Sequence, residues 1–212
     1  MKQTLIASVA LVTLAVAAPA LAGPPFLCHP FDIGSAKSLP WSGGNNWMTV
    51  NAGYEIANVV ADTDTILTDS TPIPVRMETL RRASLYASRN RVVAQQLLSM
   101  LMSRAEQPGA GALALFDAGY VLEAFDEIEA LAAYDKQFTT QARELGAVTR
   151  SHDAQAFLVR SQVLRPDDGA IDFALALLMR SSAARAEHVR KAQAAAQHDG
   201  LLASNLVKFQ WP

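Results

Sequence analysis

Residues 112–133, ALALFDAGYVLEAFDEIEALAA, decide the fold of this chain. Apolar side chains recur in this stretch at intervals of three or four residues, which is the period of an α-helix. The residues that follow this period are Leu115, Ala118, Leu122, Phe125 and Ile128. Leu113, Phe116 and Tyr120 widen the apolar stripe. Because the stripe is so wide, we expect this helix to be buried on two sides.

Two helices of the same kind are expected on the N-terminal side of this stretch. One covers residues 75–88, and the residues along its face are Met77, Leu80, Ser84 and Ala87. The other covers residues 91–107, where the side chain of Asn90 can cap the N-terminus. The residues along its face are Val93, Leu97, Met100, Leu101 and Arg104. The PGAG sequence at 108–111 ends this helix, because proline and glycine interrupt helical patterns.

The last third of the chain repeats with a period of 34 residues, in the units 135–168 and 169–202. A period of 34 residues is typical of helix–turn–helix repeats whose paired helices approach closely at small residues. The matching positions of the first unit hold Phe138, Ala142, Leu145, Ala154, Leu158, Ser161 and Pro166. Those of the second unit hold Ala176, Met179, Ala192 and Ala195.

The two units resemble tetratricopeptide repeats, and the resemblance implies antiparallel helical hairpins in an α-solenoid-like arrangement. Asp172 stands where a bulky residue is common, and His188 stands where a small one is expected. Pro108 would fall inside a helix of a preceding unit, so the repeat does not extend before residue 135. An ordinary helical domain whose alanines coincide with the pattern is the alternative. Both interpretations predict a single all-α domain over residues 75–212.

A further expectation concerns a short turn near the C-terminus. We interpret Asp199, Gly200 and Leu201 as the C-terminus of a helix, with Gly200 in the left-handed conformation and Leu201 as its apolar contact.

The first 22 residues have the pattern of a signal peptide. A positive start at Lys2 is followed by an apolar run and by the small-x-small triplet Ala20-Leu21-Ala22. Cleavage is therefore expected between Ala22 and Gly23, which predicts a periplasmic or secreted protein. A buried N-terminal helix is the alternative. No later run reaches the length of uncharged apolar residues that crosses a membrane.

Residues 23–74 contain most of the prolines and several large apolar residues. We expect an irregular, aromatic-rich strap that lies across the helices, with a helical stretch within residues 46–67. Trp41 and Trp47 are interpreted as packed anchors of this strap, and a ligand platform is the alternative.

Composition excludes several classes of protein. The 212 residues include 18 basic and 20 acidic side chains, four histidines and a single cysteine, and 50% are hydrophobic. A disordered chain, a disulfide scaffold and a strongly basic nucleic-acid binder are therefore excluded. Residues 75–107 hold six arginines and two acids, whereas residues 108–135 hold six acids and no base. These segments are expected to form a solvated ion-pair layer.

Two sets of residues offer alternatives to that layer. Arg76, Arg81 and Arg82 would suit an anionic partner, although nucleic acid is disfavoured by the net charge. Glu123 and Glu127, four residues apart, would suit a shared cation.

Cys28 and His29 are the residues closest to a recognisable chemical motif. Covalent haem attachment needs C-x-x-C-H, and here Pro25 stands in place of the first cysteine. We expect Cys28 to be a small buried thiol, with a disulfide-linked dimer as the alternative. No nucleophile elbow, zinc motif or phosphate loop is present in the sequence. We therefore assign no catalytic, cofactor-binding or metal-binding residue.

Stacked helical hairpins generally bind peptides or protein surfaces. The sequence therefore favours an exported protein-interaction or scaffold protein, with a protein or peptide partner, over an enzyme. The alternative is a periplasmic enzyme or a metal- or haem-dependent module that uses Cys28, His29 and the acids of 112–133. A catalytic role would require Cys28 to approach another histidine or an acid in a cleft.

Overall fold

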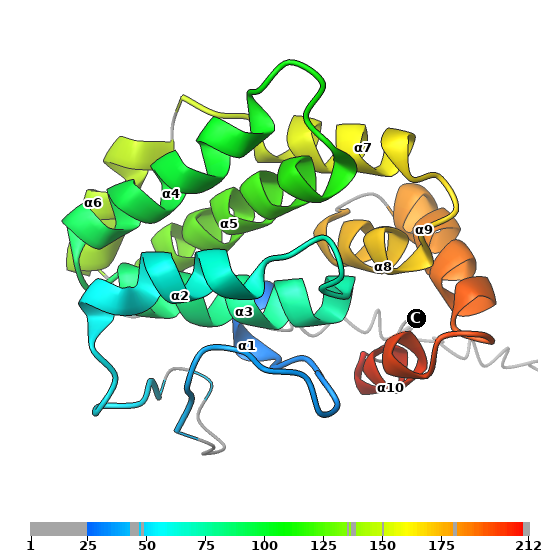
Figure 1. The fold of residues 1–212 in the computed structure, drawn as a ribbon, viewed down its shortest axis with the longest axis horizontal. Helices are drawn as coiled ribbons and strands as arrows, with labels where there is room; N and C mark the ends of the chain where they lie inside the picture. The colour runs from blue at the N-terminus through cyan, green and yellow to red at the C-terminus, as the bar shows by residue number, and fades with distance from the viewer. Residues whose placement is uncertain are drawn as a thin grey trace, which may run out of the picture.

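The computed structural model describes residues 25–42, 47, 49–134, 136, 139–149, 151–179 and 182–209. Every regular element in these ranges is a helix, which confirms the all-α class (Figure 1). The signal peptide expected at residues 1–22 lies outside the described residues, so its cleavage site stays a prediction. In the described part of the chain, no helix combines the length and apolar character needed to cross a membrane.

The first half of the chain provides five of the helical elements. They are α1 (Pro25–Cys28), the 3₁₀ helix η1 (Ile56–Asn58), α2 (Val59–Ile66), α3 (Ile73–Ala87) and α4 (Arg91–Ala105). The second half provides α5 (Ala112–Leu131), α6 (Thr139–Thr149), α7 (Ala154–Leu164), α8 (Gly169–Leu178), α9 (Ser182–Ala195) and α10 (Gly200–Lys208).

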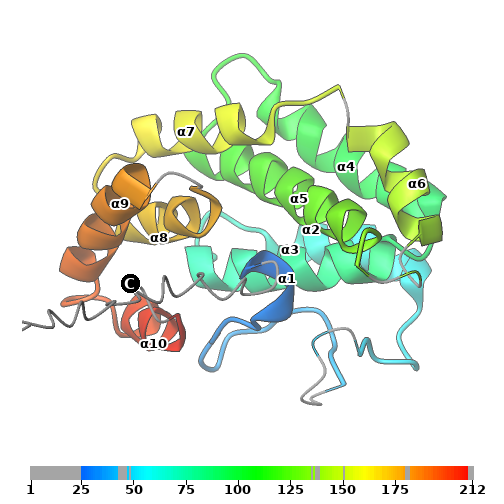
Figure 2. The same cartoon turned by 180° about the vertical axis from the view of Figure 1, so that it is seen from behind.

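Helix α5 lies at the centre of the molecule (Figures 1 and 2). It packs against α3, α4, α6 and α7, which surround it. Leu122 is 1% exposed, and Phe116 and Phe125 are fully buried. The wide apolar stripe of residues 112–133 therefore predicts correctly that this helix is covered on more than one side.

The helices on either side of the α3–α4 turn begin and end within two residues of the predicted positions. Asn90 caps α4, because its Oδ1 accepts hydrogen bonds from the backbone N–H groups of Val92 and Val93 at 3.0 and 3.4 Å. Gly109 has a φ of 77°, which favours glycine in the turn that separates α4 from α5. The predicted cap and the predicted break are thus confirmed.

Helices α5 and α7 approach each other closely at Gly119. A Cβ atom at this position would lie 2.7 Å from the Leu158 side chain and 2.8 Å from the Ala154 carbonyl oxygen. The Ser161 hydroxyl donates a 2.8 Å hydrogen bond to the Ala112 carbonyl at the other end of the contact. The small residues that the repeat pattern picks out in α7 therefore face α5. Helix α6 packs against α5 as well.

Helices α8 and α9 form the second close pair. A Cβ atom at Gly169 would lie 2.3 Å from the Cβ of Ala195, so glycine is required for this approach. Asp172 and His188, the two departures from the repeat pattern, contact each other across this interface with Oδ1 and Nδ1 2.6 Å apart. The contact between these two side chains therefore explains why both positions differ from the repeat pattern. Phe138 and the side chain of Ala142 lie outside the described residues.

The predicted helix end at Asp199-Gly200-Leu201 is wrong. Helix α10 begins at Gly200, and the Asp199 carboxylate caps it by accepting from the Leu202 N–H at 2.9 Å. Gly200 does not adopt a positive φ. The same Asp-Gly pair is compatible with either end of a helix, and here the side-chain acceptor of Asp199 selects the beginning.

The chain before α2 crosses the side of α3 that faces away from α5 (Figures 1 and 2). We call residues 27–42, 47 and 49–51 the N-terminal segment. Its buried apolar side chains are Leu27, Phe31, Leu39 and Val50. Trp41 and Trp47 are half-buried and pack against the core. Further along, η1 and α2 fall inside the range 46–67 predicted to hold a helical stretch.

Candidate functional site

The outer face of α4 is uncharged over most of its length. Residues 92–103 contain no acidic or basic residue, although the helix is flanked by arginines. The buried face of α4 is apolar, with residues such as Leu97 and Leu101 packed against the core. The side chains that point outward include Gln95, Gln96 and Ser99, all of them exposed. An ordinary solvated helix face carries charges, so this composition needs another explanation.

A groove follows this outer face, and we call it the α4 groove. Its first depression, of about 470 Å³, is lined by Val92, Gln95, Gln96, Ser99, Met100 and Ser103. A second depression, of about 360 Å³, shares Gln95, Ser99 and Ser103 with the first and extends to Glu106 and His152. A third, of about 250 Å³, shares His152 with the second. The first two depressions adjoin each other along α4, and the third meets the second only at His152.

The far end of the α4 groove lies at the beginning of α7. Asp153 caps this helix by accepting from the Ala156 N–H at 2.9 Å, which fixes the chain around His152. Phe157 and Arg160 line the third depression. The Arg160 guanidinium lies 5.9 Å from the centre of the Phe157 ring. Arg160 forms no ion pair with any residue in the described part of the chain.

The polar side chains of α4 are available for a ligand. Gln95, Gln96 and Ser99 form no hydrogen bond with the described residues through their side chains. Ser103 donates its hydroxyl proton to the Met100 carbonyl at 2.8 Å, so its oxygen remains an acceptor. The groove therefore presents the amides of Gln95 and Gln96 and the hydroxyl of Ser99, which can donate and accept hydrogen bonds, and the Ser103 oxygen, which can accept them.

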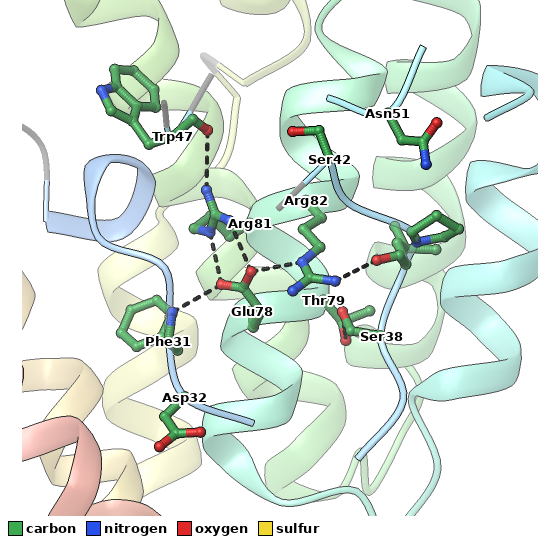
Figure 3. A network of polar contacts seen from close by, with 12 residues as sticks. Phe31, Asp32, Ser38, Ser42, Trp47, Asn51, Glu78, Thr79, Arg81 and Arg82 are labelled. Carbon is green, nitrogen blue, oxygen red and sulfur yellow. Dashed lines mark hydrogen bonds and ion pairs between the residues drawn. The ribbon is translucent and has the colours of Figure 1, made fainter. Parts of the chain in front are cut away.

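A second concentration of polar side chains lies on α3, but it is buried (Figure 3). The Glu78 carboxylate accepts from Arg81 Nε and Nη2, both at 2.8 Å, and from Arg82 Nε at 2.6 Å. The side chains of Glu78 and Arg81 are fully buried, and that of Arg82 is 16% exposed. We call these three residues the α3 ion cluster.

The α3 ion cluster holds the N-terminal segment through main-chain atoms (Figure 3). Glu78 Oε2 accepts from the Phe31 N–H at 3.0 Å. Arg81 donates to the Leu27 carbonyl at 3.1 Å, and Arg82 donates to the Leu39 carbonyl. Charges that would be costly to bury alone are thus satisfied by one another and by backbone groups.

Tyr86, one turn of α3 after Arg82, also hydrogen-bonds main-chain atoms of the N-terminal segment. Its hydroxyl donates to the Pro40 carbonyl at 2.6 Å and accepts from the Asn51 N–H at 3.0 Å. Trp41 packs its ring edge against Tyr86 and lies 4.8 Å below the Arg81 guanidinium. The half-buried Trp41 ring therefore lies beside the contacts that hold the N-terminal segment on α3.

The solvated ion-pair layer predicted between residues 75–107 and 108–135 is therefore wrong for the arginines of α3. Arg81 and Arg82 pair with an acid of their own helix, three and four residues away. Arg76 does contact an acid of α5, with Nη1 2.5 Å from Asp117 Oδ2, but both side chains are buried. Burial raises the pKa of Asp117 to about 6, against the opposing charge of Arg76. None of these arginines is exposed to an anionic partner.

Cys28 lies on α1 and senses the charge of an acid on α5. Helix α1 packs against α5, and the charge of Glu127 acts on the thiol. Burial, with the charge of Glu127, raises the pKa of Cys28 to about 11. A thiol with this pKa is protonated near neutral pH and is a poor nucleophile and metal ligand. His29 lies with its ring edge against Phe209, 5.5 Å between ring centres.

Metal ligation finds no support in the residues that the structure describes. No group of three or more histidine, cysteine, aspartate or glutamate side chains among them is placed to hold an ion. Glu123 and Glu127 both have interactions within the protein. His188 and Asp172 form a pair with Lys191 Nζ 4.0 Å from Asp172 Oδ1, which is a structural contact between α8 and α9.

A hollow of about 550 Å³ lies between the α7–α8 turn and the start of α10. Its acidic side chains include Asp168 and Asp199, which cap α8 and α10. Arg165 pairs with Asp168 at 3.3 Å. Because these carboxylates already have partners, the hollow offers less to a ligand than the α4 groove does.

Sequence reasoning missed the α4 groove. The signal was present as the uncharged run at 92–103, but charge counts over whole segments hid it. Comparison of the chain with protein-family models, with curated proteins and with solved structures found no match.

Proposed function

We propose that this protein is an exported interaction or scaffold protein that binds a protein or peptide partner in the α4 groove. One observation carries the proposal: Gln95, Gln96 and Ser99 are exposed on the uncharged outer face of α4, line depressions there, and form no side-chain hydrogen bond with the described residues. A surface of this kind binds another chain without any reacting group. The competing role, chemistry at Cys28, has no support from the pKa of its thiol.

The proposal includes an architecture in which helical hairpins resembling tetratricopeptide repeats follow the helix that carries the partner site. The packing of α8 against α9, with glycine and alanine at the closest approach, supports a hairpin over residues 169–202. The small residues of α7 support close helix packing in the unit 135–168. The helix that packs against α7 is α5, which precedes this unit, so among the described residues α6 and α7 each pack against α5 and do not form a close pair of their own.

We further propose that residues 23–74 act as a strap that fixes α3. Four side chains of α3 hydrogen-bond main-chain atoms of the N-terminal segment and support this role: Arg81, Arg82 and Tyr86 donate to carbonyls, and Glu78 accepts from an N–H. Export to the periplasm or to the medium is proposed from the pattern of residues 1–22. The intact mass of the exported protein would then begin at Gly23.

Site-specific photo-crosslinking tests the proposed function. A photoreactive benzoylphenylalanine at Ser99 should crosslink a discrete partner in cells that export the protein. The same group at Ser35, an exposed serine on the N-terminal segment, provides the matched control. A partner crosslinked from position 99 and absent from position 35 supports the proposal. Equal crosslinking from both positions, or none from position 99, would contradict it.

A further inference from the structure

The N-terminal segment is held from a second side by α10, the last helix of the described chain (Figure 1). The contact is made by Asn205, which is fully buried. Its Oδ1 accepts from the Asp32 N–H at 2.8 Å, and its Nδ2 donates to the Asp32 carbonyl at 2.9 Å. Nδ2 also donates to the Leu201 carbonyl at 2.9 Å, which fixes the orientation of the amide. One side chain thus pairs with both main-chain groups of a residue 173 positions away.

The N-terminal segment has little regular structure of its own. Helix α1 covers only four residues, and residues 29–42 contain neither helix nor strand. Side chains of α3 and α10 satisfy its main-chain groups at Leu27, Phe31, Asp32, Leu39 and Pro40. The conformation of the segment therefore depends on the helices that it contacts, as does that of a peptide that orders on binding.

Three separate apolar side chains anchor the segment, namely Leu27, Phe31 and Leu39. The Phe31 ring lies edge-on to Phe173 of α8, 6.1 Å between ring centres, and stacks on Phe209 at 5.7 Å. Residues 34–37, between the second and third anchors, are exposed. Main-chain hydrogen bonds together with pockets for a few side chains are the means by which extended peptides are recognised.

Release of the segment would leave the core of the helices in place. Helix α3 packs its opposite side against α5, and α8 packs against α9. The groups uncovered on α3 include the charges of Glu78 and Arg81, which regain water when the segment leaves. Because burial of these charges is costly, their hydration offsets part of the contacts that are lost.

The contacts also identify the sequence that fits this site. The pockets require leucine, phenylalanine and leucine at the spacing of Leu27, Phe31 and Leu39. Between them the chain turns at Gly34, whose φ of 56° favours glycine and whose N–H donates to Asp32 Oδ1 at 2.9 Å. A second copy of the chain carries all of these features in the same order.

We propose that the N-terminal segment is an exchangeable occupant of a binding site on α3, α8 and α10, and that the segment of a second copy of the chain can take its place. We call this surface the segment site; it comprises the α3 ion cluster, Tyr86, Phe173 and Asn205. The inference rests on the strap proposed above and adds that the strap can be replaced. Two copies that exchange segments form a dimer in which each contact of the segment is reused.

Hydrogen exchange on the wild-type chain tests whether the segment site opens. The Phe31 and Asp32 N–H groups are held by Glu78 and Asn205. If the segment leaves while the helices stay folded, these two amides should show protection factors at least about tenfold lower than the most protected amides of α5. Equal protection would contradict the proposal, because the segment would then leave only when the whole protein unfolds.

A fluorescein-labelled peptide with the sequence of residues 26–42 tests whether the segment site accepts the segment of another molecule. The peptide carries Cys28→Ala to prevent oxidation, and fluorescence anisotropy measures its binding to the full mature chain. Phe31→Ala in the chain weakens the resident segment, so this variant should bind the peptide at least about tenfold more tightly than the wild type. Ser35→Ala, at an exposed position, is the matched control and should bind as the wild type does.

Absence of saturable peptide binding by the Phe31→Ala chain would overturn the inference. Far-UV circular dichroism checks that this variant keeps its helices. The hydrogen-exchange test needs no variant and decides the question of opening independently.

Further changes place the peptide on Asn205. In the Phe31→Ala chain, the additional change Asn205→Ala should weaken peptide binding about tenfold, because two hydrogen bonds to Asp32 are lost. The additional change Val207→Ala, at an 84% exposed position of the same helix, should not alter binding. Methylation of the Asp32 nitrogen in the peptide should also weaken binding, and equal binding of the methylated and unmethylated peptides would contradict the inference.

A mixture of two full chains tests the second copy as the occupant. The Phe31→Ala chain has a damaged segment and an intact site at Asn205, whereas the Asn205→Ala chain has the reverse. The mixture should form a heterodimer in size-exclusion chromatography with light scattering, to a greater extent than either chain forms a dimer alone. If the peptide binds but no heterodimer forms, a second copy is the wrong occupant.

The outcomes separate this inference from the proposed functions. If Glu78→Gln destabilises the protein but the peptide does not bind, the strap stands and its exchange is excluded. Unchanged stability of Glu78→Gln would contradict the strap itself. Crosslinking from position 99 tests the α4 groove, which lies on another helix and is independent of both results.

Discussion

Replacing Glu78 with glutamine should destabilise the protein strongly, although the two side chains have nearly the same shape. The Glu78 carboxylate receives four hydrogen bonds, two from Arg81, one from Arg82 and one from the Phe31 N–H. A glutamine side chain offers one oxygen in place of two, and its NH₂ group would face guanidinium donors. Both arginines would then lose their negative partner, and Arg81 has no exposure to water.

The expected loss follows from the burial of these charges. Breaking a buried ion pair by removing one partner costs about 3–5 kcal/mol, since the remaining charge stays buried without compensation. For a chain of this size, 1 kcal/mol corresponds to a change in Tm of about 2–4 °C. Glu78→Gln should therefore lower the Tm by roughly 6–20 °C.

Urea denaturation followed by circular dichroism and by tryptophan fluorescence measures the loss. The fluorescence reports on the N-terminal segment, because Trp41 packs against the Arg81 guanidinium. Glu187→Gln is the matched control: the Glu187 side chain is 60% exposed and lies 3.7 Å from Lys191 Nζ. An exposed pair of this kind contributes about 1 kcal/mol or less.

The effect of Glu78→Gln should also depend on pH. Burial works to raise the pKa of Glu78, but the hydrogen bonds and charges of Arg81 and Arg82 outweigh it and hold the pKa below its usual value. The stabilisation is therefore complete above the unfolded value of 4.5 and is lost as the pH falls through the lower folded value. A Glu78→Gln variant within about 1 kcal/mol of the wild type at pH 7 would refute this reasoning. The reasoning would also be refuted if the difference in unfolding free energy between the wild type and Glu78→Gln did not become smaller in acid.

Three further changes test other parts of the fold. Leu122→Ala should lose about 2–5 kcal/mol in urea denaturation, because the side chain is buried in the central helix. Gly169→Ala should lose about 1–3 kcal/mol, since the new Cβ would overlap Ala195, and an unchanged denaturation midpoint would mean that α8 and α9 are further apart. The raised pKa of Asp117, about 6, means that its burial reduces stability as the pH rises from about 4 to 6. Over that range the wild type should lose about 3 kcal/mol relative to Asp117→Asn, and a constant difference would exclude the shift.

The helices could be predicted from the sequence because they depend on local patterns. Apolar residues at a helical period identify residues 112–133 as a doubly buried helix, and Asn90 and the PGAG break mark where α4 begins and ends. A local sequence signal does not decide the structure where it fits two local structures equally well. Asp199-Gly200 can end one helix or begin another, and only the chain that follows it decides.

The pairing of polar side chains could not be predicted, because it depends on contacts between residues far apart in the sequence. Segment charges correctly indicate that arginines of 75–107 need acids. They do not reveal that Glu78, on the same helix, satisfies two of those arginines, or that Glu78 and Arg81 are completely buried while Arg82 keeps 16% of its side chain exposed. The same limit applies to Asp172 and His188, which are exceptions to a repeat in the sequence and partners in space.

The sequence by itself determined the helical class, the central position of residues 112–133 and the uncharged character of residues 92–103. Each of these is a property of consecutive residues and of their period along a helix. The tertiary structure alone decided that Arg76 and Arg81 are buried and that depressions lie along the outer face of α4 and beside the first turns of α7. Burial and groove shape depend on which helices pack together, and packing joins residues that no local pattern connects.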